Sequence, residues 1–139
     1  ASLAGGEVAE ALRTPPHGRS PPQLRVLRGV LRSVPWAATM PEEALQLLAR
    51  RGEFRELGPG EPLWVPGTYA REVFVLLAGE AEQFGDGKGP RTLGYVAGDV
   101  AGLSAAGRDS PHNTTVRAGE AGAAVLALDA AVAAEARSV

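Results

Sequence analysis

TLGYVAGDVAGLSAA, at residues 92–106, is the most informative stretch of this sequence. Gly98 and Asp99 form a turn-like pair, and small residues follow from Gly102 to Ala106. Small residues at the start of a helix leave backbone N–H groups accessible, and such groups bind anions well. We therefore predict a loop that enters a short helix and has the geometry to hold an anionic group.

The composition limits the classes of protein to which the chain can belong. Its 139 residues suit one domain with a real core, and a formal net charge of −2 gives no electrostatic reason for nucleic-acid binding. The sequence has no cysteine, which fits a reducing compartment, and no apolar run long enough to span a bilayer. We expect a cytoplasmic protein without direct membrane insertion.

Two short helices are predicted near the N-terminus and one at the C-terminus. Residues 1–22 are rich in Ala, Gly, Ser and Pro, and their prolines are expected to break any helix. Residues 23–31 carry apolar side chains at helical spacing. Residues 41–50 begin with a proline and two glutamates and end at arginine, an order that the helix dipole favours. Asp129 is the expected N-cap of a last helix.

The middle of the chain carries the pattern of short strands separated by turns. The sequence EVFVLLAGEAEQF, at residues 72–84, predicts a buried strand, a tight turn at Ala78-Gly79 and a return strand. Residues 93–96, 114–117 and 123–128 are further strand candidates. The predicted fold class is mainly β with flanking helices, a jelly-roll-like β-roll of about eight short strands.

These patterns divide the chain into four segments. We expect a flexible lead-in at 1–22, an N-terminal helical segment at 23–51, a β-roll at 52–128 with the informative loop at 98–106, and the start of a C-terminal helix, cut short by the chain end, at 129–139.

The order of these elements resembles that of the cyclic-nucleotide-binding domain superfamily, over about residues 24–137. LRSVPWAATMPEEALQLLA, at residues 31–49, is similar to the family's N-terminal helices. Gly60-Glu61, Gly67 and Ala78-Gly79-Glu80 are similar to its series of glycine turns, which need positive φ or close backbone approach. Residues 98–106 resemble its phosphate-binding cassette. The resemblance implies a catabolite-regulator-like β-roll.

The resemblance also implies that two of the family's ligand anchors are missing. Gly102 matches the cassette glycine, whose neighbouring N–H groups hold the cyclic phosphate. The glutamate that binds the ribose falls on Leu103, and the arginine that pairs with the phosphate falls on His112, largely neutral near pH 7. Each such bond is worth about 1.5–3 kcal/mol, so that their joint loss lowers affinity by roughly two to four powers of ten.

Some of these residues also have purely structural interpretations. We expect His112 to lie in a surface loop, Asp99 to bond to N–H groups of its own turn, and Trp36 and Trp64 to belong to the core. Arg108 is the residue that a loop shift would bring into the place of the lost arginine. If binding is retained, the candidate ligand-binding residues are Gly98, Asp99, Gly102, Leu103, Ser104, Ala105, Arg108, His112, Asn113 and Thr114.

The sequence leaves two main functions open. The first is a regulatory or interaction domain of a larger protein, with lost or altered cyclic-nucleotide binding. Its partners would be other domains of that protein, a separate protein or a second copy. The alternative is a small-ligand or cyclic-nucleotide sensor that uses the cassette amides with Arg108. A third hypothesis, a DNA-binding regulator, is disfavoured because no helix-turn-helix follows. The chain is not expected to be an enzyme or to hold a metal or another cofactor, because it offers no catalytic set and has only two histidines.

Overall fold

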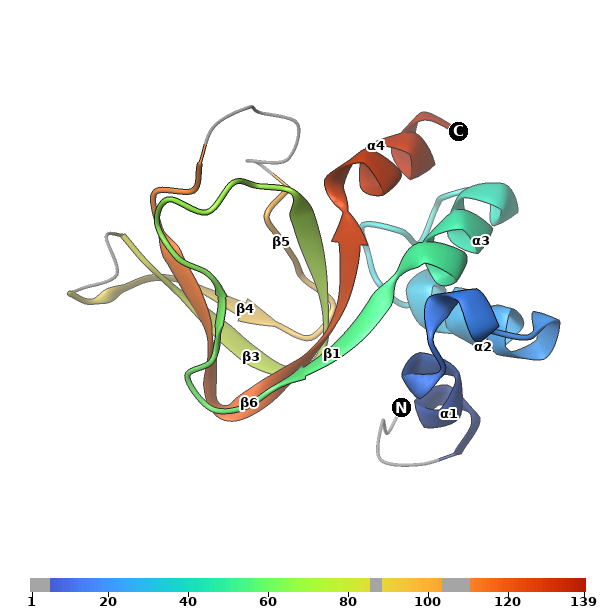
Figure 1. Cartoon of the computed structure of the whole chain (residues 1–139), viewed down its shortest axis with the longest axis horizontal. Helices are drawn as coiled ribbons and strands as arrows, with labels where there is room; N and C mark the ends of the chain where they lie inside the picture. Colours follow the sequence, from blue (N-terminus) through green and yellow to red (C-terminus); the bar gives the residue numbers. More distant parts are fainter. Residues whose placement is uncertain (1–5, 86–88, 104–110) are drawn as a thin grey trace.

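Helices pack against one side of an antiparallel β-roll in this chain (Figure 1). The computed structural model describes residues 6–85, 89–103 and 111–139. The described elements are α1 (Gly6–Arg13), the 3-10 turn η1 (Pro16–Gly18), α2 (Pro21–Arg32), α3 (Glu42–Arg51), β1 (Glu53–Leu57), β2 (Pro62–Trp64), β3 (Glu72–Phe84), β4 (Arg91–Val96), β5 (Val100–Ala101), β6 (Thr115–Asp129) and α4 (Ala130–Ser138).

Helices occupy much of residues 6–22, so the expectation that prolines exclude helix from this segment is wrong. Pro21 and Pro22 lie in the first turn of α2, where a backbone N–H has no partner to lose. Ser20 and Gln23 close a capping box at this end. The Gln23 N–H donates to the Ser20 hydroxyl over 3.3 Å, and the Ser20 N–H donates to the Gln23 side chain over 2.9 Å.

The three helices expected from periodicity are confirmed. The helix predicted at 23–31 is α2, and the one predicted at 41–50 is α3, which begins one residue later because Pro41 is its N-cap. Asp129 caps α4 through its carboxylate, which accepts from the Ala131 N–H over 2.8 Å. No helix in the described ranges is both long and apolar enough to cross a lipid bilayer.

The buried guanidinium of Arg19 joins the ends of α1 and α3. Arg19 is only 8% exposed, and no carboxylate among the described residues forms an ion pair with it. It donates instead to main-chain carbonyl groups in or just after the last turns of both helices, where carbonyls lack helical partners. The acceptors are Ala11 (3.2 Å), Leu12 (3.3 Å), Thr14 (3.2 Å), Ala49 (2.8 Å) and Gly52 (2.6 Å).

The sheet contains two long strands where pairs of short strands were expected. The described strands run in the order β1-β6-β3-β4, with β2 added to β6 and β5 added to β3. The hairpin turn predicted at Ala78-Gly79 is wrong, because β3 continues through it and bends at bulges in its pairing with β6. Likewise, β6 joins the candidates at 114–117 and 123–128. Among the described residues, six strands, two of them long and bent, form the expected β-roll in place of the predicted eight or so short strands.

Glycine is required where β3 and β6 lie against each other near the end of β1. Gly79 and Gly122 have φ angles of 79° and 76°, in the region that side chains disfavour. A side chain at Gly79 would collide with the Gly122 carbonyl, and a Cβ at Gly122 would lie 2.6 Å from the Leu57 carbonyl oxygen. The bend of the roll therefore depends on this pair.

Successive side chains of β3 and β6 enter two separate cores, because neighbouring residues of a strand point to opposite faces. One face joins the helices α1–α4 in the helical core, through Val73, Val75, Leu126 and Leu128. The other face joins the roll core, through Phe74, Leu76, Val125 and Ala127.

The Arg19 network gives a stability prediction. Arg19→Met should lower the free energy of unfolding by about 3 kcal/mol or more, because several buried carbonyls lose their donors. Urea denaturation followed by circular dichroism measures the change. Arg50→Met, at an exposed arginine of α3, is the control and should shift stability by at most about 0.5 kcal/mol. Equal effects of the two substitutions would contradict the role of Arg19.

Candidate functional site

The turn that leads into the cassette is fixed by backbone bonds to β3. Gly98, with φ of 98°, donates its N–H to the Leu76 carbonyl over 2.8 Å, and the Leu76 N–H donates to the Asp99 carbonyl over 2.8 Å. The Asp99 carboxylate accepts from the Val96 N–H over 2.8 Å. The prediction that Asp99 bonds within its own turn is confirmed.

Gly102 allows the cassette to lie close to β3 and to an indole ring. Its φ is 99°, and it is buried. An added Cβ would lie 3.2 Å from the Glu72 carbonyl oxygen and 3.5 Å from the ring of Trp64. Gly102 therefore meets both a conformational and a steric requirement, as expected for the cassette glycine.

The indole of Trp64 and the imidazole of His112 form a parallel stack beside the cassette. Their ring centroids are 4.0 Å apart, and the ring planes differ by 7°. The Trp64 indole N–H donates to the Thr114 hydroxyl over 3.1 Å. Trp64 is 6% exposed and also lies against Phe74, with centroids 6.0 Å apart. The expectation that Trp64 belongs to the core is confirmed.

His112 is buried, so the expectation of a surface-loop histidine is wrong. It is 8% exposed, and its backbone pairs with the turn that follows β2. The His112 N–H donates to the Thr68 carbonyl over 2.7 Å, and the Gly67 N–H donates to the His112 carbonyl over 2.9 Å. These two bonds hold the imidazole flat against Trp64.

The stack carries no positive charge at neutral pH. Burial lowers the pKa of His112 below its ordinary value of 6.5, because desolvation disfavours the imidazolium. Where the family resemblance places a permanently charged arginine, this chain has a neutral ring pressed against another ring.

The other predicted site residues divide into three groups. Leu103 is half-buried and packs against the helical core, so it brings an apolar side chain to the position of the missing glutamate. Thr114 supports Trp64, whereas Asn113 is exposed. Three predicted residues lie outside the described ranges: Ser104, Ala105 and Arg108.

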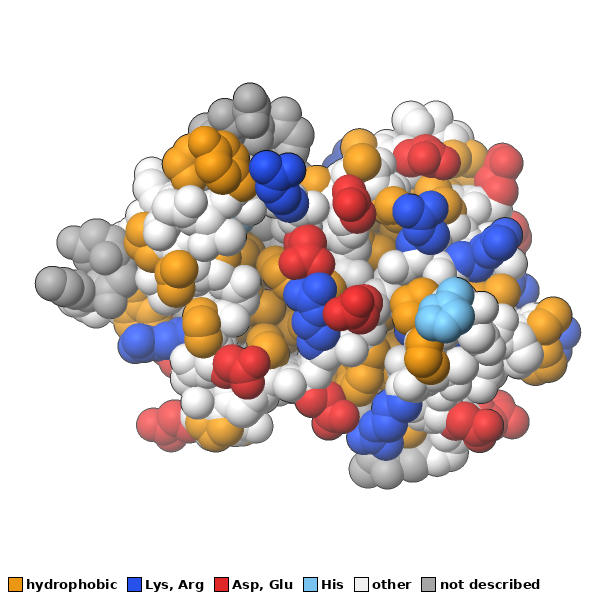
Figure 2. Space-filling view, in the orientation of Figure 1, with side chains coloured by type: hydrophobic (Ala, Val, Ile, Leu, Met, Phe, Trp, Pro, Cys, Tyr) orange, Lys and Arg blue, Asp and Glu red, His pale blue; other side chains and the backbone are white. Residues whose placement is uncertain are grey.

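Charged side chains of both signs are interspersed on the face seen in Figure 2, with no large patch of one sign. In the described ranges, charges of opposite sign also pair directly: the Arg55 guanidinium pairs with Glu72 over 2.7 Å and with Glu53 over 2.8 Å. A nucleic-acid interface would need a concentrated basic surface, which this face does not provide.

The β-roll, its flanking helices and its glycine-cornered cassette turn form the fold of cyclic-nucleotide-binding domains. The solved structures similar to this chain have that fold, which confirms the expected fold class and the resemblance. No protein-family model and no curated protein sequence matches the chain.

Three solved structures illustrate the likeness. The regulatory domain of protein kinase A from Toxoplasma gondii, with cAMP, has a TM-score of 0.72 at 18% identity, over 82% of this chain and 45% of that one. The sensor domain of the transcriptional regulator DNR from Pseudomonas aeruginosa has a TM-score of 0.72 at 15% identity, over 83% and 79%. The regulatory subunit of a cAMP-independent protein kinase A from Trypanosoma cruzi, bound to guanosine, has a TM-score of 0.70 at 19% identity, over 77% and 39%. The chain thus spans less than half of both kinase regulatory chains.

The buried histidine predicts a loss of stability in acid. Because the pKa of His112 is lowered by folding, the unfolded chain takes up a proton before the folded chain does. The free energy of unfolding should therefore fall as the pH drops below 6.5 and through the lower pKa of the folded state. His112→Phe keeps a ring on Trp64 and does not titrate, so it should lose less stability between pH 7 and pH 5.

Urea denaturation at several pH values measures this difference. All other titratable groups are identical in the two proteins, so their contributions cancel in the comparison. If the free energy of unfolding fell equally with pH in the two proteins, His112 would not be the cause of the acid instability.

Proposed function

We propose that this chain is a regulatory or interaction domain of a larger protein in which the cyclic-nucleotide-binding fold has lost its usual ligand binding. The observation that carries this proposal is the neutral Trp64–His112 stack beside Gly102. The proposed partners are other domains of the same protein, a separate protein or a second copy. A cytoplasmic location stays a prediction from the sequence.

Charge and space both act against a cyclic nucleotide at this place. Neither Leu103 nor His112 offers the ionic or hydrogen-bonding anchors that the family uses, which removes about 3–6 kcal/mol of binding free energy. A ligand that entered between the cassette and the roll would also have to displace the stacked rings, at a further cost of about 0.5–1.5 kcal/mol. A micromolar site would become millimolar or weaker.

A second candidate function is the binding of a neutral ligand. The Trypanosoma cruzi regulatory subunit, which is cAMP-independent, is bound to guanosine, and guanosine has no phosphate. Leu103 and the neutral His112 suit an uncharged molecule better than an anion. The alternative that uses Arg108 with the cassette amides also stays a prediction, because Ser104, Ala105 and Arg108 lie outside the described ranges.

Calorimetric titration with cAMP, cGMP and guanosine tests the proposal. We expect no saturable binding of either cyclic nucleotide below about 1 mM, and no thermal stabilisation, whereas a ligand at 100 times its Kd would add about 2.7 kcal/mol. Saturation at micromolar cyclic nucleotide would refute the loss of binding. Micromolar binding of guanosine alone would establish the second candidate instead.

Restoring the two missing anchors shows how much of the lost cAMP affinity comes from the absent charged side chains and how much from the stacked rings. Leu103→Glu with His112→Arg restores both anchors but keeps the indole, so we expect the affinity for cAMP to rise at least a hundredfold, because the anchors account for most of the loss. Adding Trp64→Leu should raise it further, by a factor of about two to ten. In a neighbour of the same fold, a triple mutant of a cAMP-independent regulatory subunit from Trypanosoma brucei, with one change that introduces arginine, is bound to cAMP.

Circular dichroism must show that each variant is folded, because shortening a buried tryptophan costs stability. Unchanged, weak cAMP binding by the double variant would contradict the assignment of the loss to the two missing anchors. Equal binding by the double and triple variants would contradict the role of Trp64.

A further inference from the structure

β4 forms an open edge of the sheet. It is the last strand in the order β1-β6-β3-β4, and β3 is the strand that pairs with it among the described residues. Together with the end of β3 it forms a ribbon that extends from the roll, on the left of Figure 1. Every residue of β4 except the half-buried Tyr95 is exposed. Alternate residues of such a strand direct N–H and C=O groups away from the sheet, where another strand can bind them.

The sequence of β4 does not protect this edge. Proteins usually protect an exposed edge with charged residues, proline or a very short strand. β1, at the other end of the strand order, follows this rule, because three of its five residues, EFREL, are charged. β4 has no charged residue after Arg91, and it exposes Leu93 and Val96 to 47% and 60%. We expect a partner strand to cover such an edge.

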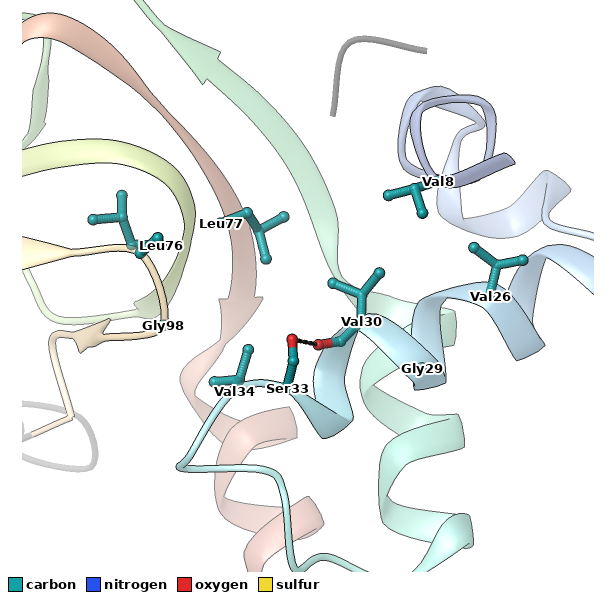
Figure 3. A pocket seen from close by; sticks show the side chains of 10 residues that line it. Val8, Val26, Gly29, Val30, Ser33, Val34, Leu76, Leu77 and Gly98 are labelled. Atoms are coloured by element: carbon teal, nitrogen blue, oxygen red, sulfur yellow. Dashed lines mark hydrogen bonds between the residues drawn. The ribbon is translucent and has the colours of Figure 1, made fainter. Parts of the chain in front are cut away.

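The edge of β4 specifies its partner more closely than the groove between the helices and β3 does. That groove is lined by uncharged side chains. Ser33, the only polar side chain among its described lining residues, already donates to the Val30 carbonyl over 2.6 Å (Figure 3). The lining of the groove therefore selects no particular partner. The open N–H and C=O groups of β4 have the spacing of a strand and require one.

We infer that β4 pairs in antiparallel orientation with β4 of a second copy of this chain, about a two-fold axis at Gly94. In this register Leu93 of each copy lies opposite Tyr95 of the other, and Thr92 lies opposite Val96. An aliphatic side chain meets an aromatic one on one face, and two β-branched side chains meet on the other. No charged residue enters these pairs. The strand is therefore complementary to itself, as a two-fold interface requires.

Nothing in the described part of a single chain requires glycine at position 94. The φ angle of Gly94 is not positive, and an added Cβ would touch only the flexible end of the Arg91 side chain, 3.4 Å away. Glycine weakens the interior of a strand, and it often marks a place where another backbone approaches closely. A two-fold axis at Gly94 accounts for such an approach.

The interface is small, so the dimer is expected to be weak. β4 has six residues, whereas a standard interface has about 20–30 residues on each side. We therefore expect the dimer to form at about 0.1–1 mM chain. The inference narrows the proposed function to one of its partners, a second copy, but it does not rest on the loss of nucleotide binding. A monomer that ignores cAMP would refute only the dimer, and a dimer that binds cAMP tightly would refute only the loss of binding.

Oxidative cross-linking tests the register, because the chain has no cysteine of its own. Gly94→Cys places two thiols at opposed positions, where Cα atoms are about 4.5–5.5 Å apart and a disulfide can form. Thr92→Cys is the matched control on the same face of β4, because its two Cα atoms would be about 14 Å apart. We expect Gly94→Cys to cross-link at least tenfold faster than Thr92→Cys.

Sedimentation equilibrium tests the dimer without a thiol. Thr92→Lys with Val96→Lys places like charges opposite one another, and so does Thr92→Glu with Val96→Glu. We expect the wild type to dimerise as its concentration approaches about 1 mM, and each charged variant to stay monomeric. An equimolar mixture of the two variants should dimerise, because opposite charges then face each other. Circular dichroism must show that each variant is folded.

Several results would overturn the proposal. One is a wild type that stays monomeric up to about 1 mM. Another is cross-linking by Gly94→Cys that is no faster than that by Thr92→Cys, or slower than that by Leu93→Cys, which would place the axis elsewhere. Dimerisation of either charged variant alone, as strong as that of the wild type, would also refute the pairing. If Gly94→Cys does not fold, the sedimentation experiment decides.

Discussion

Burial of both faces of β3 and β6 is the constraint on which the rest of this structure depends. The two strands pair along most of their length, and their alternating side chains supply the helical core on one face and the roll core on the other. Helices must cover one face because it is apolar, and β2 with Trp64 must cover part of the other. Gly79 and Gly122 allow both strands to bend enough to do so.

The chemistry of the candidate site depends on the side chains that fill the roll core beside the cassette. In a binding domain of this fold, the polar groups of the ligand would form hydrogen bonds and ion pairs with side chains beside the cassette. Here the rings of Trp64 and His112 stack on each other, and the Thr114 hydroxyl accepts the hydrogen bond from the Trp64 indole N–H. Under the proposed function, a site filled in this way gains little from a ligand. The fold would then act through the surfaces that it presents to other domains or proteins.

The sequence predicts those features that depend on near neighbours. The caps at Asp99 and Asp129 involve partners within three residues, and the helices beginning near residues 23 and 41 follow from periodicity, so these predictions are accurate. Gly79 is misinterpreted because positive φ serves a strand bulge as well as a hairpin turn.

Long-range contacts give no local signal in the sequence. Arg19 bonds to carbonyls 30 and 33 residues away, and Trp64 reaches Thr114, 50 residues further along the chain. An arginine in a proline-rich segment and a histidine after a proline look like surface residues when they are considered alone. The fold could therefore be predicted well, the cassette residues in part, and the aromatic stack and the arginine network not at all.

The Arg19 network also makes the N-terminal layer cooperative. A single guanidinium closes the ends of α1 and α3, and its bond to Gly52 lies immediately before β1. Separation of α1 from the body would leave the Arg19 guanidinium with only two of its five carbonyl acceptors, so α1 and the end of α3 are expected to open together rather than fray one residue at a time. A force or a partner that acts on the first helix is thereby transmitted to the first strand of the roll.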